Sequence, residues 1–270
     1  MVNSRTSSGW SRGRLAVTGG HLAYHRTGGG GPALVLSHGL TDNGLCWSRL
    51  AEALAPDFDV IMLDARGHGD SSRMAGGPDP DPARDIAEAI AQLGLSSPIV
   101  MGHSIGARAT ADFAAAWPGI PGRVVLEDPP FLPLPDEAAI AIRQQKFRQH
   151  LDSFRSLSLA EIEALGRKSS PGWHDDEFPA WAASKRQVDP EAMPHYRTAW
   201  QTAIARIAAP TLLIHGDPAL GGLVTLALAA EARSLNPNMT AVQIRGAGHN
   251  IRRENFVDFL EAVRGFLKAS

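Results

Sequence analysis

The sequence Gly102-His103-Ser104-Ile105-Gly106 decides how this chain folds. It follows the apolar run Pro98-Ile99-Val100-Met101 and precedes a segment of helical character at 107–117. A Gly-x-Ser-x-Gly motif between a buried strand and a helix is typical of a sharp turn that raises a serine hydroxyl above the edge of a sheet. The glycines leave room for a strained backbone and for close strand–helix packing, where a Cβ would clash. The motif therefore predicts that Ser104 is a nucleophile.

The composition excludes several classes of protein. The chain has 270 residues, of which 44% are hydrophobic and 20% charged, as is ordinary for a soluble globular enzyme. A formal net charge of -2 gives no electrostatic reason to bind nucleic acid or an anionic membrane. Cys46 is the only cysteine, and the histidines lack metal-ligand spacing, so we expect no disulfide, no metal and no cofactor.

No apolar run approaches the roughly 20 residues that would span a bilayer. The first 14 residues are rich in Ser, Arg and Gly and lack the apolar core of a secretory signal. We therefore expect a cytoplasmic protein whose partner is a small molecule. The sequence leaves the oligomeric state open, with a homodimer as one assembly that it allows.

Buried strands alternate with helices along most of the chain. Short apolar runs predict the strands, and the longer segments between them have helical character, which favours a mostly parallel sheet with helices on both faces. Residues 15–17 and 22–24 form a predicted hairpin ahead of these strands. The expected strands are 33–36, 60–63, 99–101, 124–126, 211–214 and 241–244, and the expected helices are 47–55, 82–93, 104–116, 223–234 and 254–267.

The alternation stops between Phe131 and about Ala205. This segment has no convincing buried strand, has helical patterns at 136–154 and 159–167, and contains three of the six tryptophans. We interpret residues 131–205 as a helical cap inserted over the strand ends, with residues 1–130 and 206–270 forming the core domain.

A serine hydroxyl needs a base that removes its proton, and His249 is the best candidate. It lies in the loop Gly246-Ala247-Gly248-His249-Asn250, between the last expected strand and the last helix. The base in turn needs a carboxylate to fix its tautomer. Asp128 and Asp217 each follow a buried strand, and Glu127 is a third alternative that should face away from Asp128, because neighbouring side chains on a strand alternate.

Four motifs in this order resemble those of the α/β-hydrolase family, and the resemblance covers essentially the whole chain. They are His38-Gly39-Leu40, Asp64-Ala65-Arg66-Gly67-His68-Gly69, Gly102-His103-Ser104-Ile105-Gly106 and Gly246-Ala247-Gly248-His249. The resemblance implies a mostly parallel sheet of eight strands with helices on both faces and an inserted cap. It says much less about the substrate.

The resemblance also bears on the choice of the acid. In most members of the family the acid follows the seventh strand in a Gly-x-x-Asp pattern, where this chain has Ala219 and where Asp217 comes two residues early. Some members, such as the haloalkane dehalogenases and the zearalenone lactonase, have the acid after the sixth strand. Asp128, 24 residues beyond Ser104, falls at that place. The resemblance therefore favours Asp128 over Asp217.

Two backbone amides are expected to form the oxyanion hole. The nucleophile-elbow motif assigns one to Ile105, the residue after the serine. The resemblance implies that the other belongs to Leu40, after His38-Gly39.

These residues predict a serine hydrolase that cleaves a carboxylic ester or lactone through an acyl-enzyme on Ser104. The apolar residues of the cap, including Phe131, Trp173 and Trp181, suggest a hydrophobic small molecule as substrate. A hydrolase of carbon–carbon bonds and a cofactor-free perhydrolase would use the same triad. A non-catalytic ligand receptor on the same fold is the alternative from another class.

Overall fold

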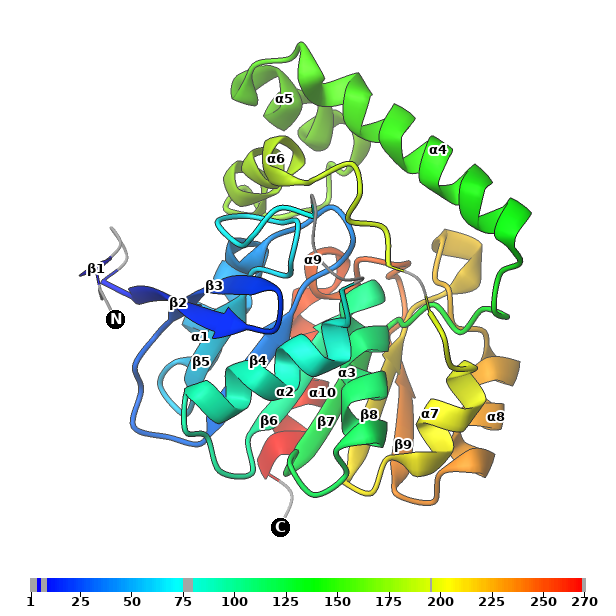
Figure 1. Ribbon diagram of the computed structural model, residues 1–270. Helices are drawn as coiled ribbons and strands as arrows, with labels where there is room; N and C mark the ends of the chain where they lie inside the picture. Colours follow the sequence, from blue (N-terminus) through cyan, green and yellow to red (C-terminus); the bar gives the residue numbers. More distant parts are fainter. Residues whose placement is uncertain (1–3, 6–8, 75–79, 195, 269–270) are drawn as a thin grey trace.

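The computed structural model describes residues 4–5, 9–74, 80–194 and 196–268, and a single sheet runs through them (Figure 1). The strand order is β1-β2-β3-β5-β4-β6-β7-β8-β9. The predicted eight-stranded, mostly parallel sheet is confirmed, and the two-residue β1 adds a ninth strand at one edge. The strands are β1 (Ser4–Arg5), β2 (Ser11–Val17), β3 (Gly20–Arg26), β4 (Ala33–Ser37), β5 (Asp59–Leu63), β6 (Ile99–His103), β7 (Arg123–Glu127), β8 (Thr211–His215) and β9 (Met239–Gln243).

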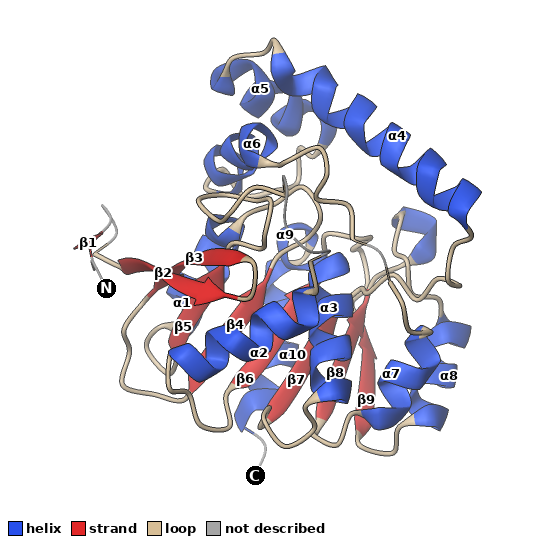
Figure 2. Cartoon of the chain, in the orientation of Figure 1, coloured by secondary structure: helices blue, strands red, loops and turns tan. Residues whose placement is uncertain are grey.

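Helices cover both faces of the sheet (Figure 2). One face is covered by α2 (Pro82–Gln92), α3 (Ile105–Ala116), α7 (Trp200–Arg206) and α8 (Leu226–Leu235). The other is covered by α1 (Ser48–Leu54), α9 (Ile251–Glu254) and α10 (Phe256–Lys268). The short 3-10 helices η1 (Gly44–Trp47) and η2 (Pro218–Leu220) lie in loops after β4 and β8.

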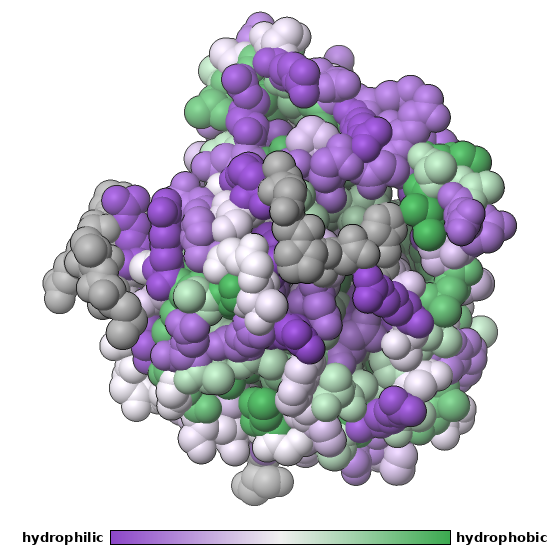
Figure 3. Space-filling view, viewed as in Figure 1, coloured by the Kyte–Doolittle hydropathy of each residue, from purple (hydrophilic) through white to green (hydrophobic). Residues whose placement is uncertain are grey.

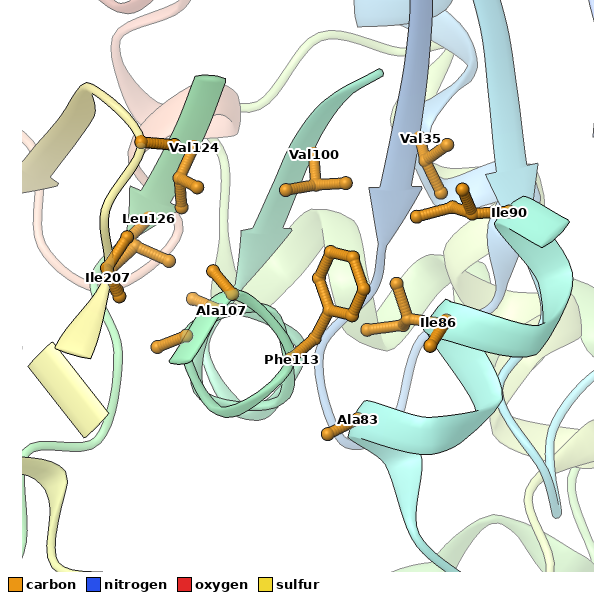
Figure 4. Packing of buried hydrophobic residues seen from close by; sticks show 14 of the residues in the cluster. Val35, Ala83, Ile86, Ile90, Val100, Ala107, Phe113, Val124, Leu126 and Ile207 are labelled. Atoms are coloured by element: carbon orange, nitrogen blue, oxygen red, sulfur yellow. The ribbon is translucent and has the colours of Figure 1, made fainter. Parts of the chain in front are cut away.

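The parallel strands are apolar on both sides because each face of the sheet is buried. Phe113 points from α3 toward Val100 and Val35 of the sheet, and Ile86 and Ile90 of α2 lie beside it (Figure 4). All five side chains are at most 4% exposed. This packing fixes α3, and with it the turn at the end of β6.

Three helices between β7 and β8 lie above the strand ends: α4 (Glu137–Arg155), α5 (Leu159–Ser169) and α6 (Glu177–Gln187). Figure 3 shows a mostly hydrophilic surface over α4, whose only buried residues are Phe147, Leu151 and Phe154. The fourth helix of the inserted segment, α7, packs on α3 and α8 beside the sheet. The segment predicted as a cap thus contributes α4–α6 above the sheet and α7 to its flank.

Helix α8 begins at Leu226, three residues later than the sequence predicts. The side chain of Thr225 caps it by accepting a hydrogen bond from the Leu228 amide. Leu223 and Val224 do not join the helix because their amides donate to the Asp128 carboxylate, at 2.8 and 3.1 Å. The start of α8 is therefore set by the functional site.

Candidate active site

Ser104 lies in a strained turn between β6 and α3. Its backbone has a φ of +55°, in the left-handed region that non-glycine residues rarely adopt. A Cβ on Gly102 would overlap the carbonyl of Gly106, and one on Gly106 would overlap the carbonyl of Ser37. The two glycines therefore let the strand, the turn and the helix approach closely enough to hold Ser104 at the strand end.

The structure brings Ser104, His249 and Asp128 together from three separate loops. His249 Nε2 lies 3.0 Å from Ser104 Oγ, and His249 Nδ1 lies 2.6 Å from Asp128 Oδ2. The Asp128 side chain is fully buried, whereas 28% of the His249 side chain is exposed. Because ionised Asp128 can only accept hydrogen bonds, it fixes the proton of a neutral His249 on Nδ1 and leaves Nε2 free to accept from the serine.

Asp128 is held by more than the imidazole. Its own backbone is strained, with a φ of +44°, and its amide donates to the Ile214 carbonyl at 2.8 Å. The amides of Leu223 and Val224 donate to its two carboxylate oxygens. These contacts orient the carboxylate toward His249 and compensate its burial.

The other two acidic candidates make different contacts. Glu127 is fully buried on the opposite side of the strand end and accepts hydrogen bonds from the amide and the guanidinium of Arg252. Asp217 caps η2, and its side chain accepts from the Ala219 amide at 2.9 Å. Of the three carboxylates, only that of Asp128 contacts His249 in the described part of the chain.

The two amides expected to form the oxyanion hole belong to segments that adjoin Ser104. Ile105 is the first residue of α3, so its N–H has no acceptor within the helix and lies in the positive field of the helix N-terminus. Leu40 is in the loop after β4, and its carbonyl accepts a hydrogen bond from His68 Nε2 at 2.7 Å. Gly39 of the same loop packs against His103 and Ser104, where an added Cβ would lie 2.9 Å from His103 Nδ1.

Three buried histidines support these loops. His103 Nε2 donates to the His249 carbonyl at 3.0 Å, and the two rings lie 4.8 Å apart. His38 Nε2 accepts from the Ala65 amide at 2.9 Å. Burial lowers the pKa of His103 and His68, and lowers that of His38 to about 3, so all three stay neutral at pH 7.

A buried ionic cluster, which sequence reasoning missed, joins the Leu40 loop to the cap. Asp42 lies within 3.5 Å of Lys185 on α6 and within 3.2 Å of Arg252 and Arg253 on α9. Lys185 also donates to the carbonyl and hydroxyl of Thr41, both at 2.8 Å. No short sequence pattern links these residues, because they come from three distant segments.

The cluster balances its charges. Glu127 and Glu177 pair with Arg252 and Arg253, so three carboxylates face three cations, all in buried residues. Burial by itself would raise the pKa of Asp42, but Arg253, Lys185 and Arg252 hold it well below its usual range. Asp42 is therefore ionised, and the cluster ties the Leu40 loop, the His249 loop and α6 to one another.

The aromatic residues predicted to bind substrate pack among themselves. The Phe131 ring stacks on Trp200 of α7 at 4.3 Å between centroids. Trp173 and Trp181 lie 6.3 Å apart, with the Arg253 guanidinium over Trp173 and the Lys185 ammonium over Trp181. None of the three lines the two cavities beside the elbow as far as the described residues define them. Their contact with substrate stays a prediction.

Two cavities meet beside the elbow, and both are lined by Ile105, Pro194 and Tyr196. The larger one, of about 350 Å³, lies between α2, α3 and the segment before α7. The smaller one, of about 170 Å³, lies under α4 and includes Arg143 and Pro130. Among the described residues, no group of three His, Cys, Asp or Glu side chains is arranged to hold a metal. Nor does any described helix have the length and apolar character to cross a membrane.

Comparisons with known proteins agree with this architecture. Residues 34–262 match the alpha/beta hydrolase family. The chain is 32% identical to N-formylmaleamate deformylase of Pseudomonas putida, over 94% of this chain and 96% of that protein. It is 29% identical to 2-(acetamidomethylene)succinate hydrolase of Mesorhizobium japonicum, over 90% of this chain and 91% of that one.

A crystal structure of E-2-(acetamidomethylene)succinate hydrolase superposes with a TM-score of 0.81 and 25% identity, over 96% of this chain and 100% of that chain. Lipase LipV of Mycobacterium tuberculosis is 29% identical, over 78% of this chain and 79% of that protein. The family match spans most of the chain and includes every segment that contributes to the Ser104 site. The chain therefore belongs to the alpha/beta hydrolase family.

Proposed function

We propose that this protein is a serine hydrolase that cleaves the acyl bond of a small molecule, an ester or lactone, through a covalent acyl-enzyme on Ser104. The observation that carries the proposal is the relay Ser104 Oγ–His249 Nε2–His249 Nδ1–Asp128 Oδ2, with distances of 3.0 and 2.6 Å. Both distances are within hydrogen-bonding range, so a proton can leave the serine along a preformed path.

In the first half of the proposed reaction, Ser104 Oγ attacks the acyl carbon while His249 Nε2 takes its proton. The carbonyl oxygen becomes an oxyanion, which the Ile105 and Leu40 amides stabilise. The tetrahedral intermediate then collapses, the bond to the leaving group breaks, and the imidazolium of His249 protonates that group. Asp128 stabilises the imidazolium throughout.

In the second half, a water molecule gives a proton to His249 Nε2 and attacks the acyl carbon of the ester on Ser104. Collapse of the second intermediate releases a carboxylic acid and returns the proton to Ser104. No metal or cofactor takes part in the proposed steps. The larger cavity, about 350 Å³ in volume, has room for a small molecule next to Ile105.

Amide hydrolysis is a second candidate, because two relatives are named for acylated nitrogen compounds. These are N-formylmaleamate deformylase and 2-(acetamidomethylene)succinate hydrolase, and each is similar over nine tenths or more of this chain. Lipase LipV, similar over a shorter part of the chain, supports ester cleavage. Both reactions use the same relay, and an amide depends more on protonation of its leaving group by His249.

Hydrolysis of a panel of 4-nitrophenyl esters, lactones and N-acyl compounds would test the proposal. We expect saturable hydrolysis of at least one member, and stoichiometric labelling by a fluorophosphonate that is lost in Ser104→Ala. A folded wild-type protein that neither hydrolyses any member nor reacts with the fluorophosphonate would favour the receptor alternative. Peroxyacid formation or cleavage of a β-diketone at a higher kcat/KM than the best ester would favour the perhydrolase or the carbon–carbon hydrolase.

A further inference from the structure

The small cavity beside the elbow has an uneven distribution of charge. Its described lining is apolar except for Arg143 of α4 and Tyr196, and it contains no carboxylate. Ile105, the residue after Ser104, forms part of its wall. A ligand group in this cavity would therefore lie next to the acyl carbon under attack and face one cation.

Arg143 has no hydrogen-bond or ion-pair partner among the residues that the structure describes. This is unusual within its own helix, where Arg148 binds both carboxylate oxygens of Glu191 and Arg155 pairs with Asp152. Arg143 is half-buried against the cavity, so its charge is not simply solvated on the outer face of α4. A buried or half-buried charge is normally paired, and here the cavity is the place where a partner would sit.

Tyr196 gives a second, independent observation. Its hydroxyl is buried and has no hydrogen-bond partner among the described residues. Its ring is stacked on Arg108, with 4.6 Å from the guanidinium carbon to the ring centroid, so the phenol cannot turn away freely. Because buried polar groups are nearly always satisfied, an unpartnered hydroxyl in a cavity wall points to a ligand atom.

The larger cavity does not share this character. Asp81, Asp85 and Asp112 line it together with Arg197 and with Arg66, which is paired with Asp85. Arg108 is likewise neutralised by Asp112, at 3.1 Å. Carboxylates thus accompany the cations of the larger cavity, so an anionic group would be attracted more strongly by the smaller one, whose described lining has a cation and no carboxylate.

We propose that the small cavity binds a carboxylate of the substrate, with the Arg143 guanidinium as its cation and the Tyr196 hydroxyl as a further donor. The inference rests on the proposed hydrolysis at Ser104 and specifies its substrate class: short acyl compounds that carry a free carboxylate near the scissile bond. The N–H groups of a guanidinium and the O–H group of a phenol can both donate hydrogen bonds to the two oxygens of a carboxylate. The apolar remainder of the cavity strengthens this attraction by excluding water.

Two matched substrates test the charge preference. Ethyl hydrogen succinate carries the carboxylate, and ethyl succinamate replaces it with a neutral amide of the same shape. We expect the wild type to hydrolyse the charged ester with a kcat/KM about 10- to 100-fold above that for the neutral one, as is typical of a hydrogen bond to a charged group. Equal values, or a preference for the amide, would overturn the proposal.

Variants assign the preference to residues. Arg143→Gln should remove most of the preference, Arg143→Lys should retain part of it, and Tyr196→Phe should reduce it. Hydrolysis of neutral 4-nitrophenyl butyrate should stay within about threefold of wild type in the two Arg143 variants, since a subsite for the carboxylate adds nothing there. Arg148→Gln on the same helix, outside the described cavity lining, is the matched control and should keep the full preference. Loss of preference in Arg148→Gln, or its retention in Arg143→Gln, would contradict the assignment.

A binding experiment separates this proposal from the proposed function. Calorimetry with succinate and the Ser104→Ala protein needs no turnover, and we expect binding that Arg143→Gln weakens about 10-fold or more. Arg143-dependent binding without any hydrolysis by the wild type would retain the subsite and refute the hydrolase. Hydrolysis of neutral esters without Arg143-dependent binding or preference would retain the hydrolase and refute the subsite.

Discussion

Replacing Asp128 by asparagine should inactivate the enzyme, because the site has no place for an amide NH₂. Asp128 Oδ2 accepts from His249 Nδ1 at 2.6 Å and from the Leu223 amide at 2.8 Å, and Oδ1 accepts from the Val224 amide at 3.1 Å. All three contacts are donors, and the side chain is fully buried. A carboxylate satisfies them, whereas asparagine has one oxygen and must turn its NH₂ toward one side.

Both orientations of the asparagine are harmful. If its NH₂ takes the place of Oδ2, it opposes the Leu223 amide, and the imidazole must present an unprotonated Nδ1 and move its proton to Nε2, which then cannot accept from Ser104. If its NH₂ faces the Val224 amide, two donors meet in a buried site, at about 1–3 kcal/mol of stability. Each orientation leaves one buried backbone donor without an acceptor. Even in the second orientation a neutral amide stabilises the imidazolium of His249 less than a carboxylate does, so we expect activity to fall in either case. In the serine proteases the same change lowers kcat by about 10⁴, which corresponds to about 5.5 kcal/mol of transition-state stabilisation.

The assay is steady-state hydrolysis of 4-nitrophenyl butyrate by Asp128→Asn and Asp217→Asn, with thermal unfolding of each variant as a check on folding. Asp217 caps η2 and accepts from the Ala219 amide, a role that asparagine fills about as well. We expect Asp217→Asn to keep its kcat within about threefold. A larger loss in Asp217→Asn than in Asp128→Asn, with both proteins folded, would refute the assignment of the acid.

Three further results are expected. Lys185→Met removes the hydrogen bonds and the ion pair that Lys185 makes with Thr41 and Asp42, so the Leu40 loop should loosen and kcat should fall up to about 100-fold. An unchanged kcat in the folded variant would contradict a positioning role. Burial raises the pKa of the Cys46 thiol to about 11, so iodoacetamide at pH 8 should modify Cys46 readily in the unfolded chain and hardly at all in the native protein. Mass spectrometry would measure both rates, and equal rates would be inconsistent with that burial. Burial lowers the pKa of His38 from 6.5 to about 3, so the unfolded chain binds a proton below pH 6.5 that the folded one does not. His38 should then contribute a fall of about 1.4 kcal/mol per pH unit to the free energy of unfolding below pH 6.5, and His38→Gln should lack that contribution in urea titrations. The same pH slope in both proteins would argue against a neutral buried His38.

The parts of the fold that follow local sequence patterns could be predicted. The strands are short apolar runs. The turn at Ser104 has a motif whose two glycines lie so close to neighbouring backbone that a Cβ would not fit. The alternation of side chains on a strand predicted that only one of Asp128 and Glu127 faces the site, and the structure has the two on opposite sides, toward His249 and Arg252. Such rules need only the neighbouring residues.

Features set by distant segments could not be predicted. The sequence of the inserted segment did not predict that α7 packs beside α3, because an apolar helix face gives no information about which element it packs against. The start of α8 was predicted three residues early. The Leu223 and Val224 amides donate instead to Asp128, which lies 95 and 96 positions earlier in the sequence. The ionic cluster around Asp42 joins residues up to 211 positions apart.

The same reasoning explains why the substrate is the least predictable property of this chain. The residues of the proposed reaction sit at strand ends, where sheet topology alone brings them together. Arg143 and Tyr196 come from a helix and a loop of the inserted segment, and they meet Ile105 only through tertiary packing. The sequence of an amphipathic helix predicts that its arginines are solvated at the surface, and Arg148 on the same helix is indeed exposed and paired with Glu191. What distinguishes Arg143 is that no carboxylate of the described residues pairs with it in an apolar cavity, so substrate charge has to be inferred from the folded site.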